Sequence, residues 1–293
     1  EQAASALAKL ATANRHTQKE IAAAGGIAPL ISLIDRGMSD TAREWAAAAL
    51  AELALLKTNK TAIDRAGGIS PLVSLLLYDG AYGAKRYAAS ALARLSTDGV
   101  VTDAQLAAKA KAADNEPQSK GAVSKAEQIA EAGAIVPLVT LLNGDSGADA
   151  QEEAAGALLA LAAESTNRLA ITESGGIGPL VLLLGCDNPT AREHAEGALV
   201  RLSIENFNRV LIIKQLVGML LDSGTAAQEQ AAAALANLAR DSTDNRVSIV
   251  DAGGIPPLLG LLDSNSSRAK ENATSAITQL CATKANQDAI ASA

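Results

Sequence analysis

The sequence predicts an all-α protein, a solenoid of stacked three-helix units that repeat every 42 residues. The main observation is an internal repeat, because the segment at 25–34 returns almost unchanged at 67–76. Its proline occurs as Pro29, Pro71, Pro137, Pro179 and Pro257, with Gln215 in its place in one unit. A second observation is composition: 48% of residues are hydrophobic but only 2% are aromatic, which suits thin layers of closely packed helices.

The first and second helices of each unit are predicted from their start and stop signals. An Asn four residues before an Ile is expected to cap the first helix, since its side chain accepts a free backbone N–H there. The positions are Asn59, Asn167, Asn208, Asn245 and Asn286, with Thr17 and Lys125 in the other two units. A Gly pair then stops this helix, and proline opens the short second helix.

The third helix of each unit is the longest and carries an apolar stripe. At 43–53, for example, Ala46, Ala49, Leu50 and Leu53 recur at spacings of three and four, which places them on one helical face. One unit cannot bury this stripe by itself, so the units are expected to stack.

We expect one solenoid over 1–293 with two irregularities. The full units are 17–54, 59–97, 125–163, 167–204, 208–240 and 245–283, with partial units at 1–12 and 286–293. Residues 98–124 form an insertion that is expected to be flexible; the alternative is a flap over the groove or a regulated docking segment. The unit at 208–240 lacks both the Gly pair and the proline, so its first two helices are expected to merge.

Charge and residue usage bound the class of protein. A net charge of −7 disfavours a nucleic-acid binder, which needs a basic face. No apolar run is long enough for a membrane span, and the N-terminus does not read as a signal peptide. The two cysteines, Cys186 and Cys281, are expected to be reduced thiols in an intracellular protein of the cytoplasm, the nucleus or both.

The sequence contains no recognisable pattern of catalytic or metal-binding residues. The two histidines, His16 and His194, stand far apart in the array, and neither is expected to form a metal site or a Cys–His pair. The Gly pairs recur in most units as helix breaks, so they are not a nucleotide-binding fingerprint. We therefore expect no enzyme activity, no metal and no cofactor.

A 42-residue, three-helix unit with a Gly-Gly break resembles the armadillo repeat over essentially the whole chain. The segments 253–259 and 270–276 are most similar to plant-type armadillo proteins, including the arms of U-box ubiquitin ligases. The resemblance implies a right-handed superhelix whose third helices line a concave groove for an extended peptide. In the nuclear-import adaptors of this family, repeated Asn and Trp residues hold a basic peptide; here Asn237 alone matches that Asn and no Trp matches.

Candidate groove residues occupy the Asn slot that the resemblance assigns to the third helices, or a slot seven residues earlier that shares its helical face. They are Trp45, Glu52, Tyr87, Arg94, Glu153, His194, Arg201, Gln230, Asn237, Asn272 and Gln279. Trp45 and Tyr87 are the candidate anchors, because rings are scarce in this chain; alternatively they only fill gaps between helices. Arg94 and Arg201 either pair with acidic partner groups or are solvated surface residues.

A row of acids also recurs near the start of the third helices, namely Glu44, Glu152, Glu193, Glu229 and Glu271. It could form a track for a basic ligand. We favour a structural interpretation, in which each Glu lies in the first turn and completes a capping box, as in Thr41–Glu44.

The leading function is a protein-interaction scaffold that binds a protein or peptide. The alternatives are a nuclear-transport adaptor and the substrate-recruiting arm of a ubiquitin ligase. Because the array begins and ends within a unit, we expect the chain to be part of a longer protein.

Replacing residues 98–124 with a short Gly/Ser linker should leave the melting temperature nearly unchanged, because this segment offers little apolar surface to bury. Thermal unfolding followed by circular dichroism checks this, and a clear drop would show that the insertion packs against the helices.

Overall fold

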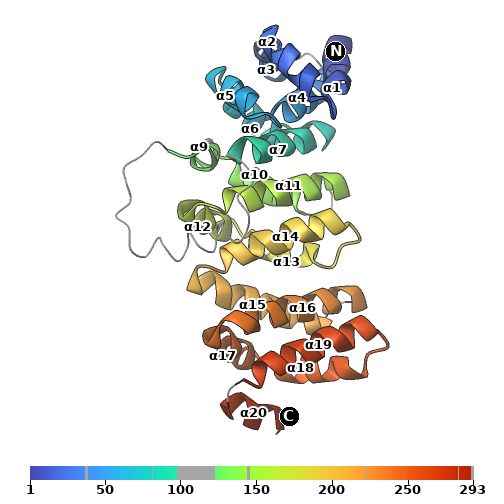
Figure 1. The fold of residues 1–293 in the computed structure, drawn as a ribbon, viewed down its shortest axis with the longest axis vertical. Coiled ribbons are helices and arrows are strands. Elements are labelled where there is room, and N and C mark those ends of the chain that lie inside the picture. The colour runs from blue at the N-terminus through green and yellow to red at the C-terminus, as the bar shows by residue number, and fades with distance from the viewer. Residues whose placement is uncertain are drawn as a thin grey trace. The chain divides into compact units, whose positions relative to one another are not determined.

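The computed structural model describes residues 1–36, 39–80, 82–97, 123–143, 146–222, 224–282 and 284–291. Every regular element in these ranges is a helix (Figure 1), which confirms the all-α prediction. The chain divides into two compact units, Glu1–Gly175 and Gly176–Ala293. Residues 98–122 of the predicted insertion lie outside the described residues.

The unit Glu1–Gly175 is a stack of three-helix repeats. Its first helices are α2 (Arg15–Ala23), α5 (Lys57–Arg65), α9 (Lys125–Glu131) and α12 (Ser165–Glu173). Its second helices are α3 (Ile27–Arg36), α6 (Ile69–Leu77) and α10 (Ile135–Leu141). Its third helices are α1 (Gln2–Ala11), α4 (Asp40–Leu53), α7 (Tyr82–Ser96) and α11 (Ala148–Leu161). Each third helix packs against the next, so α1, α4, α7 and α11 lie side by side (Figure 1).

The unit Gly176–Ala293 continues the pattern with one change. It contains α13 (Ile177–Leu183), α14 (Pro189–Leu202), α15 (Asn206–Asp222), α16 (Thr225–Asp241), α17 (Thr243–Asp251), α18 (Ile255–Gly260), the 3₁₀ turn η2 (Leu261–Asp263), α19 (Ser267–Leu280) and α20 (Lys284–Ala291). The single helix α15 replaces a separate first and second helix, which confirms the predicted merger. Helix α16 packs on both α15 and α19.

The third helices are buried on several sides because their interior residues are small. In α4 the six consecutive residues 46–51 are all buried, each at most 5% exposed, and five of them are alanines. This helix packs on α1, α3 and α7 at once, so every side of that stretch faces another helix. Alanine at these positions permits close approach and also favours the helix.

The Gly pair performs two different tasks. The first glycine of the pair has a positive φ, for example 71° at Gly67, and so ends the first helix in the left-handed region. The second glycine lies against the preceding helix: a Cβ on Gly68 would be 2.7 Å from the side chain of Ile63. The N–H of Gly68 donates to the Ile63 carbonyl at 2.9 Å. In the repeat where Ala134 replaces this glycine, the equivalent hydrogen bond to the Ile129 carbonyl is longer, 3.3 Å.

The recurring Asn is not a helix cap, so that prediction was wrong. Asn167 is buried within α12, whose N-cap is Glu164, and its Nδ2 donates to the carbonyl oxygens of Ala126 (3.1 Å) and Leu161 (3.0 Å). The equivalent Asn59 is also buried, and its amide donates to the Gln18 carbonyl 3.0 Å away in the preceding repeat. This amide connects successive repeats, because it donates a buried hydrogen bond to a carbonyl in the first helix of the preceding repeat.

The caps of several helices are provided by other residues. Asn14 caps α2, Asn188 caps α14 and Ser242 caps α17. Ser124 forms a capping box with Glu127 at the start of α9. A linker that replaces the insertion should therefore keep Ser124, since loss of a cap costs about 1 kcal/mol.

We predict that Asn167→Ala lowers the free energy of unfolding by about 1–3 kcal/mol, because two buried hydrogen bonds, to α9 and to α11, are lost. Urea denaturation measures the change. Asn143→Ala, which removes an exposed amide in the same unit, is the control and should have little effect. Equal effects of the two substitutions would contradict a role for Asn167 in connecting the repeats.

Candidate functional site

The candidate groove residues lie on the third helices and all keep contact with solvent. Ten of the eleven are half-buried and Asn237 is exposed. In the unit Glu1–Gly175 they lie on α4, α7 and α11, and in the unit Gly176–Ala293 on α14, α16 and α19. We call the solvent-accessible side chains of α1, α4, α7 and α11 the third-helix surface.

Trp45 lines an open hollow between α1 and α4. The other lining residues are Glu1, Gln2, Ser5, Ala6 and Lys9. The ammonium of Lys9 lies over the indole, 5.5 Å from the ring centroid. Trp45 thus contacts the neighbouring repeat and at the same time leaves part of its ring open to solvent, which combines the two interpretations given to it.

Tyr87 is also accompanied by a cation of the chain. The guanidinium of Arg86 lies 5.1 Å from the centre of the Tyr87 ring. The same guanidinium donates to Asp149 on α11, with Nη1 and Oδ2 2.6 Å apart. Two interactions therefore stabilise this position of Arg86, the contact with the ring and the ion pair with the carboxylate.

Arg94 already has an acidic partner within the chain. Its Nη1 donates to Glu52 Oε1 at 3.0 Å and to the Ala51 carbonyl at 2.7 Å, which joins α7 to α4. Both side chains of the pair are half-buried. Two candidate groove residues, Glu52 and Arg94, are therefore partners of each other across one repeat.

Glu153 lies one repeat further on and contacts the same helix. Burial raises the pKa of Glu153, while a hydrogen bond from Ser90 and the positive charge of Arg94 partly offset that rise. Ser90 itself is buried on α7. These contacts bring Glu52, Arg94 and Glu153 together in one polar cluster on the third-helix surface.

In the unit Gly176–Ala293 the candidate residues also bond across repeats. Asn272 Nδ2 donates to the Glu229 carbonyl at 2.9 Å, and Asn237 Nδ2 lies 3.4 Å from Glu196 Oε1. His194, Gln230 and Gln279 are half-buried on α14, α16 and α19. Arg201 shares α14 with His194.

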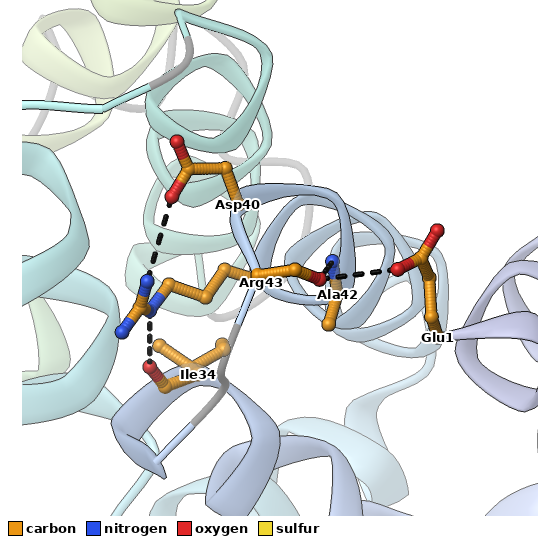
Figure 2. Close-up of polar contacts among 6 residues, drawn as sticks. Glu1, Ile34, Asp40, Ala42 and Arg43 are labelled. Atoms are coloured by element: carbon orange, nitrogen blue, oxygen red, sulfur yellow. Dashed lines mark hydrogen bonds and ion pairs between the residues drawn. The ribbon is translucent and has the colours of Figure 1, made fainter.

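The recurring acids do not form capping boxes, so this detail of the prediction was wrong. Helix α4 begins at Asp40, and Ser39 caps it by accepting from the Ala42 N–H (Figure 2). Thr41 therefore lies inside the helix and Glu44 falls in its second turn. Arg43, from the same helix, donates to the Ile34 carbonyl of α3 and lies over the ring of Tyr78, 4.5 Å from its centre.

Acidic side chains instead approach the start of the next third helix. Glu1 accepts a hydrogen bond from Ser39, the cap of α4, at 3.1 Å (Figure 2). Glu229 likewise accepts from Ser266, the cap of α19. A Cβ on Gly83, at the start of α7, would lie 2.4 Å from Glu44. A negative charge at a helix N-terminus is stabilising, so these acids hold the stack together.

Some residues of this surface were not chosen from the sequence. Lys9, Arg86 and Ser90 complete the contacts to Trp45, Tyr87 and Glu153. The signal for Lys9 was present, because it occupies the same slot as Glu52 and Arg94 one and two repeats further along.

Within the described residues, no group of three or more His, Cys, Asp or Glu side chains could hold a metal ion. Cys186 and Cys281 are free thiols. Among the described helices none has the length and apolar character needed to cross a bilayer.

Comparison with known proteins supports the armadillo fold. The armadillo/beta-catenin-like repeat model matches residues 242–282, which hold α17 to α19. An engineered protein of known crystal structure is 28% identical, with a TM-score of 0.59 over 87% of this chain and 96% of that chain. A designed armadillo repeat protein is 23% identical, with a TM-score of 0.58 over 87% of this chain and 99% of that one.

The fold is that of an armadillo-repeat protein. Such scaffolds are generally not catalytic, and they bind peptides or proteins. A designed armadillo protein that is 20% identical, with a TM-score of 0.57, is known in complex with the peptide (KR)4; the likeness covers 87% of this chain and 99% of that one. The E3 ubiquitin-protein ligase SPL11 of Oryza sativa subsp. japonica is 41% identical over 68 residues, which is 23% of this chain and 10% of that relative.

We predict that Glu153→Gln raises the melting temperature near neutral pH. A raised carboxyl pKa means that the folded state holds the proton more tightly, so the charged form disfavours folding above that pKa. The gain should shrink as pH falls and vanish below the ordinary value of about 4.5. Melting curves at several pH values test this; Glu131→Gln, at an exposed position, is the control. A gain that is the same at every pH would contradict the assignment.

Proposed function

We propose that this armadillo protein is an interaction scaffold that binds an extended partner segment along its third helices. The observation that carries the proposal is the open hollow at Trp45, where the single tryptophan of the chain stays accessible between α1 and α4. An accessible tryptophan in a partly desolvated hollow is a typical hot spot for binding. The predicted groove residues are retained here as the proposed contact set.

The dimensions of the stack suit an extended peptide. Packed helices lie roughly 8–10 Å apart, and an extended chain rises about 3.3 Å per residue. Each repeat would therefore contact two or three residues of the partner. The complex of a designed armadillo protein with the peptide (KR)4 supports this mode of binding for the fold.

The chemistry of the surface favours a different peptide from (KR)4. Lys9 and Arg86 lie over the two anchor rings, and Arg94 lies between the carboxylates of α4 and α11. We propose an acidic or mixed segment with an aromatic or aliphatic anchor. A nuclear-transport adaptor is the less favoured alternative, because the repeated Asn and Trp residues that hold a basic signal are missing.

The arm of a ubiquitin ligase is a second candidate, and the stretch shared with SPL11 supports it. In that case this array would recruit the substrate or position the ligase. Both functions place the protein inside the cell, in the cytoplasm, the nucleus or both. A net charge of −7 argues against nucleic acid as the partner.

We predict that a lysine-rich import-signal peptide binds no tighter than high micromolar at physiological salt, while an acidic or mixed peptide with an apolar anchor binds more tightly. Trp45→Ala should weaken the second peptide about tenfold or more, as expected for a hot spot. Titration calorimetry measures both.

Phe207→Ala is the control, because it removes an exposed ring from the other unit and should not change affinity. Tight and salt-resistant binding of the basic peptide would overturn the proposal and support the transport-adaptor alternative.

A further inference from the structure

The aromatic anchors of the third-helix surface are each occupied by a cation of the chain itself. Lys9 projects from α1 onto Trp45 of α4, and Arg86 lies over the adjacent Tyr87 of α7. An ammonium or guanidinium over a ring is also the arrangement by which aromatic residues hold a basic ligand. The place that a lysine or arginine of a bound peptide would take is thus filled before the peptide arrives.

We propose that Lys9 is a specificity-determining residue that excludes basic side chains from the Trp45 hollow; this inference rests on the proposed function of the surface. Two effects act together. A basic side chain must displace the Lys9 ammonium from the ring, and it meets a like charge in a hollow that six residues line. An anionic or apolar side chain meets neither obstacle, and Lys9 provides it with a positive charge.

Lys9 is suited to this role because it is exposed and has no carboxylate partner among the described contacts, whereas the cation over Tyr87 has one. Arg86 Nη1 lies 2.6 Å from Asp149 Oδ2, so moving it off its ring would also break this ion pair. Among the described contacts Lys9 has only its ring, and it can swing toward a carboxylate without breaking a salt bridge. Glu1, the acid among the residues that line the hollow, accepts a hydrogen bond from Ser39 at 3.1 Å.

The single tryptophan makes the hollow directly observable, because all tryptophan emission of the chain comes from it. The first experiment needs no peptide. Collisional quenching by iodide, an anion, and caesium, a cation, is compared for the wild type, Lys9→Met and Lys19→Met. Lys19 is an exposed lysine of α2, so its substitution changes the net charge equally. Lys9→Met should lower quenching by iodide and raise quenching by caesium, and Lys19→Met should do neither.

The second experiment measures affinity with the peptide (KR)4, using the Trp45 emission. Lys9→Met should bind this peptide about two- to fivefold more tightly than Lys19→Met does, which is the range expected for one solvent-exposed cation–π contact. An acidic peptide with an aromatic anchor should lose affinity in Lys9→Met alone.

The outcomes separate the two proposals. If the quenching shifts as described but no peptide binds any variant, the placement of Lys9 stands and the proposed scaffold function fails. If Lys9→Met and Lys19→Met behave alike in quenching or in binding (KR)4, Lys9 does not guard the hollow. Tight binding of (KR)4 by the wild type with a changed Trp45 emission also overturns the inference.

Discussion

The close packing of the alanine-rich third helices is the constraint on which the rest of this molecule depends. A stretch such as 46–51, buried on every side, leaves no room for larger side chains. Because a three-helix repeat cannot bury its own apolar faces, each repeat is stable only with its neighbours. The same packing excludes rings from the interior of the third-helix layer, so Trp45 and Tyr87 remain at its surface.

A second consequence is that polar residues must connect the repeats. The buried amide of Asn167 donates both to the carbonyl at the end of the preceding third helix and to a carbonyl of the preceding first helix. At the other end, carboxylates such as Glu229 meet the first turn of the next third helix. Both kinds of residue recur in most repeats for structural reasons, and recurrence alone therefore does not identify a ligand track.

Much of the fold could be predicted from the sequence because its signals are local. The positive φ at Gly67 and the merged helix α15 follow from residues within one repeat. The roles of Asn59 and Glu44 could not be predicted in the same way, because their partners lie in a neighbouring repeat. The identity of a residue does not show whether its side-chain oxygen or nitrogen bonds within its own repeat or to a neighbouring repeat.

The candidate site was partly predictable for a related reason. The slots that face the third-helix surface were identified by spacing, but the pairing of Arg94 with Glu52 spans 42 residues, one full period. The contact of Asn272 with Glu229 spans 43. In a stacked repeat protein, opposite charges one period apart are neighbours, and this rule would have revealed the pair.

The pairing has a consequence for recognition. A surface whose charged groups already have partners gains little from a second ion pair, because the first must be broken or shared. Arg94 and Arg86 therefore contribute more to the shape of the surface than to the attraction of a ligand. The Trp45 hollow is then the place where a ligand meets Lys9, a cation without a carboxylate partner among the described contacts. Selectivity on such a surface comes from the difference between ligands that must displace an internal cation and ligands that can use it. The exposed Lys9 over the Trp45 ring is enough to create that difference, since every peptide meets the same side chains along the rest of the surface.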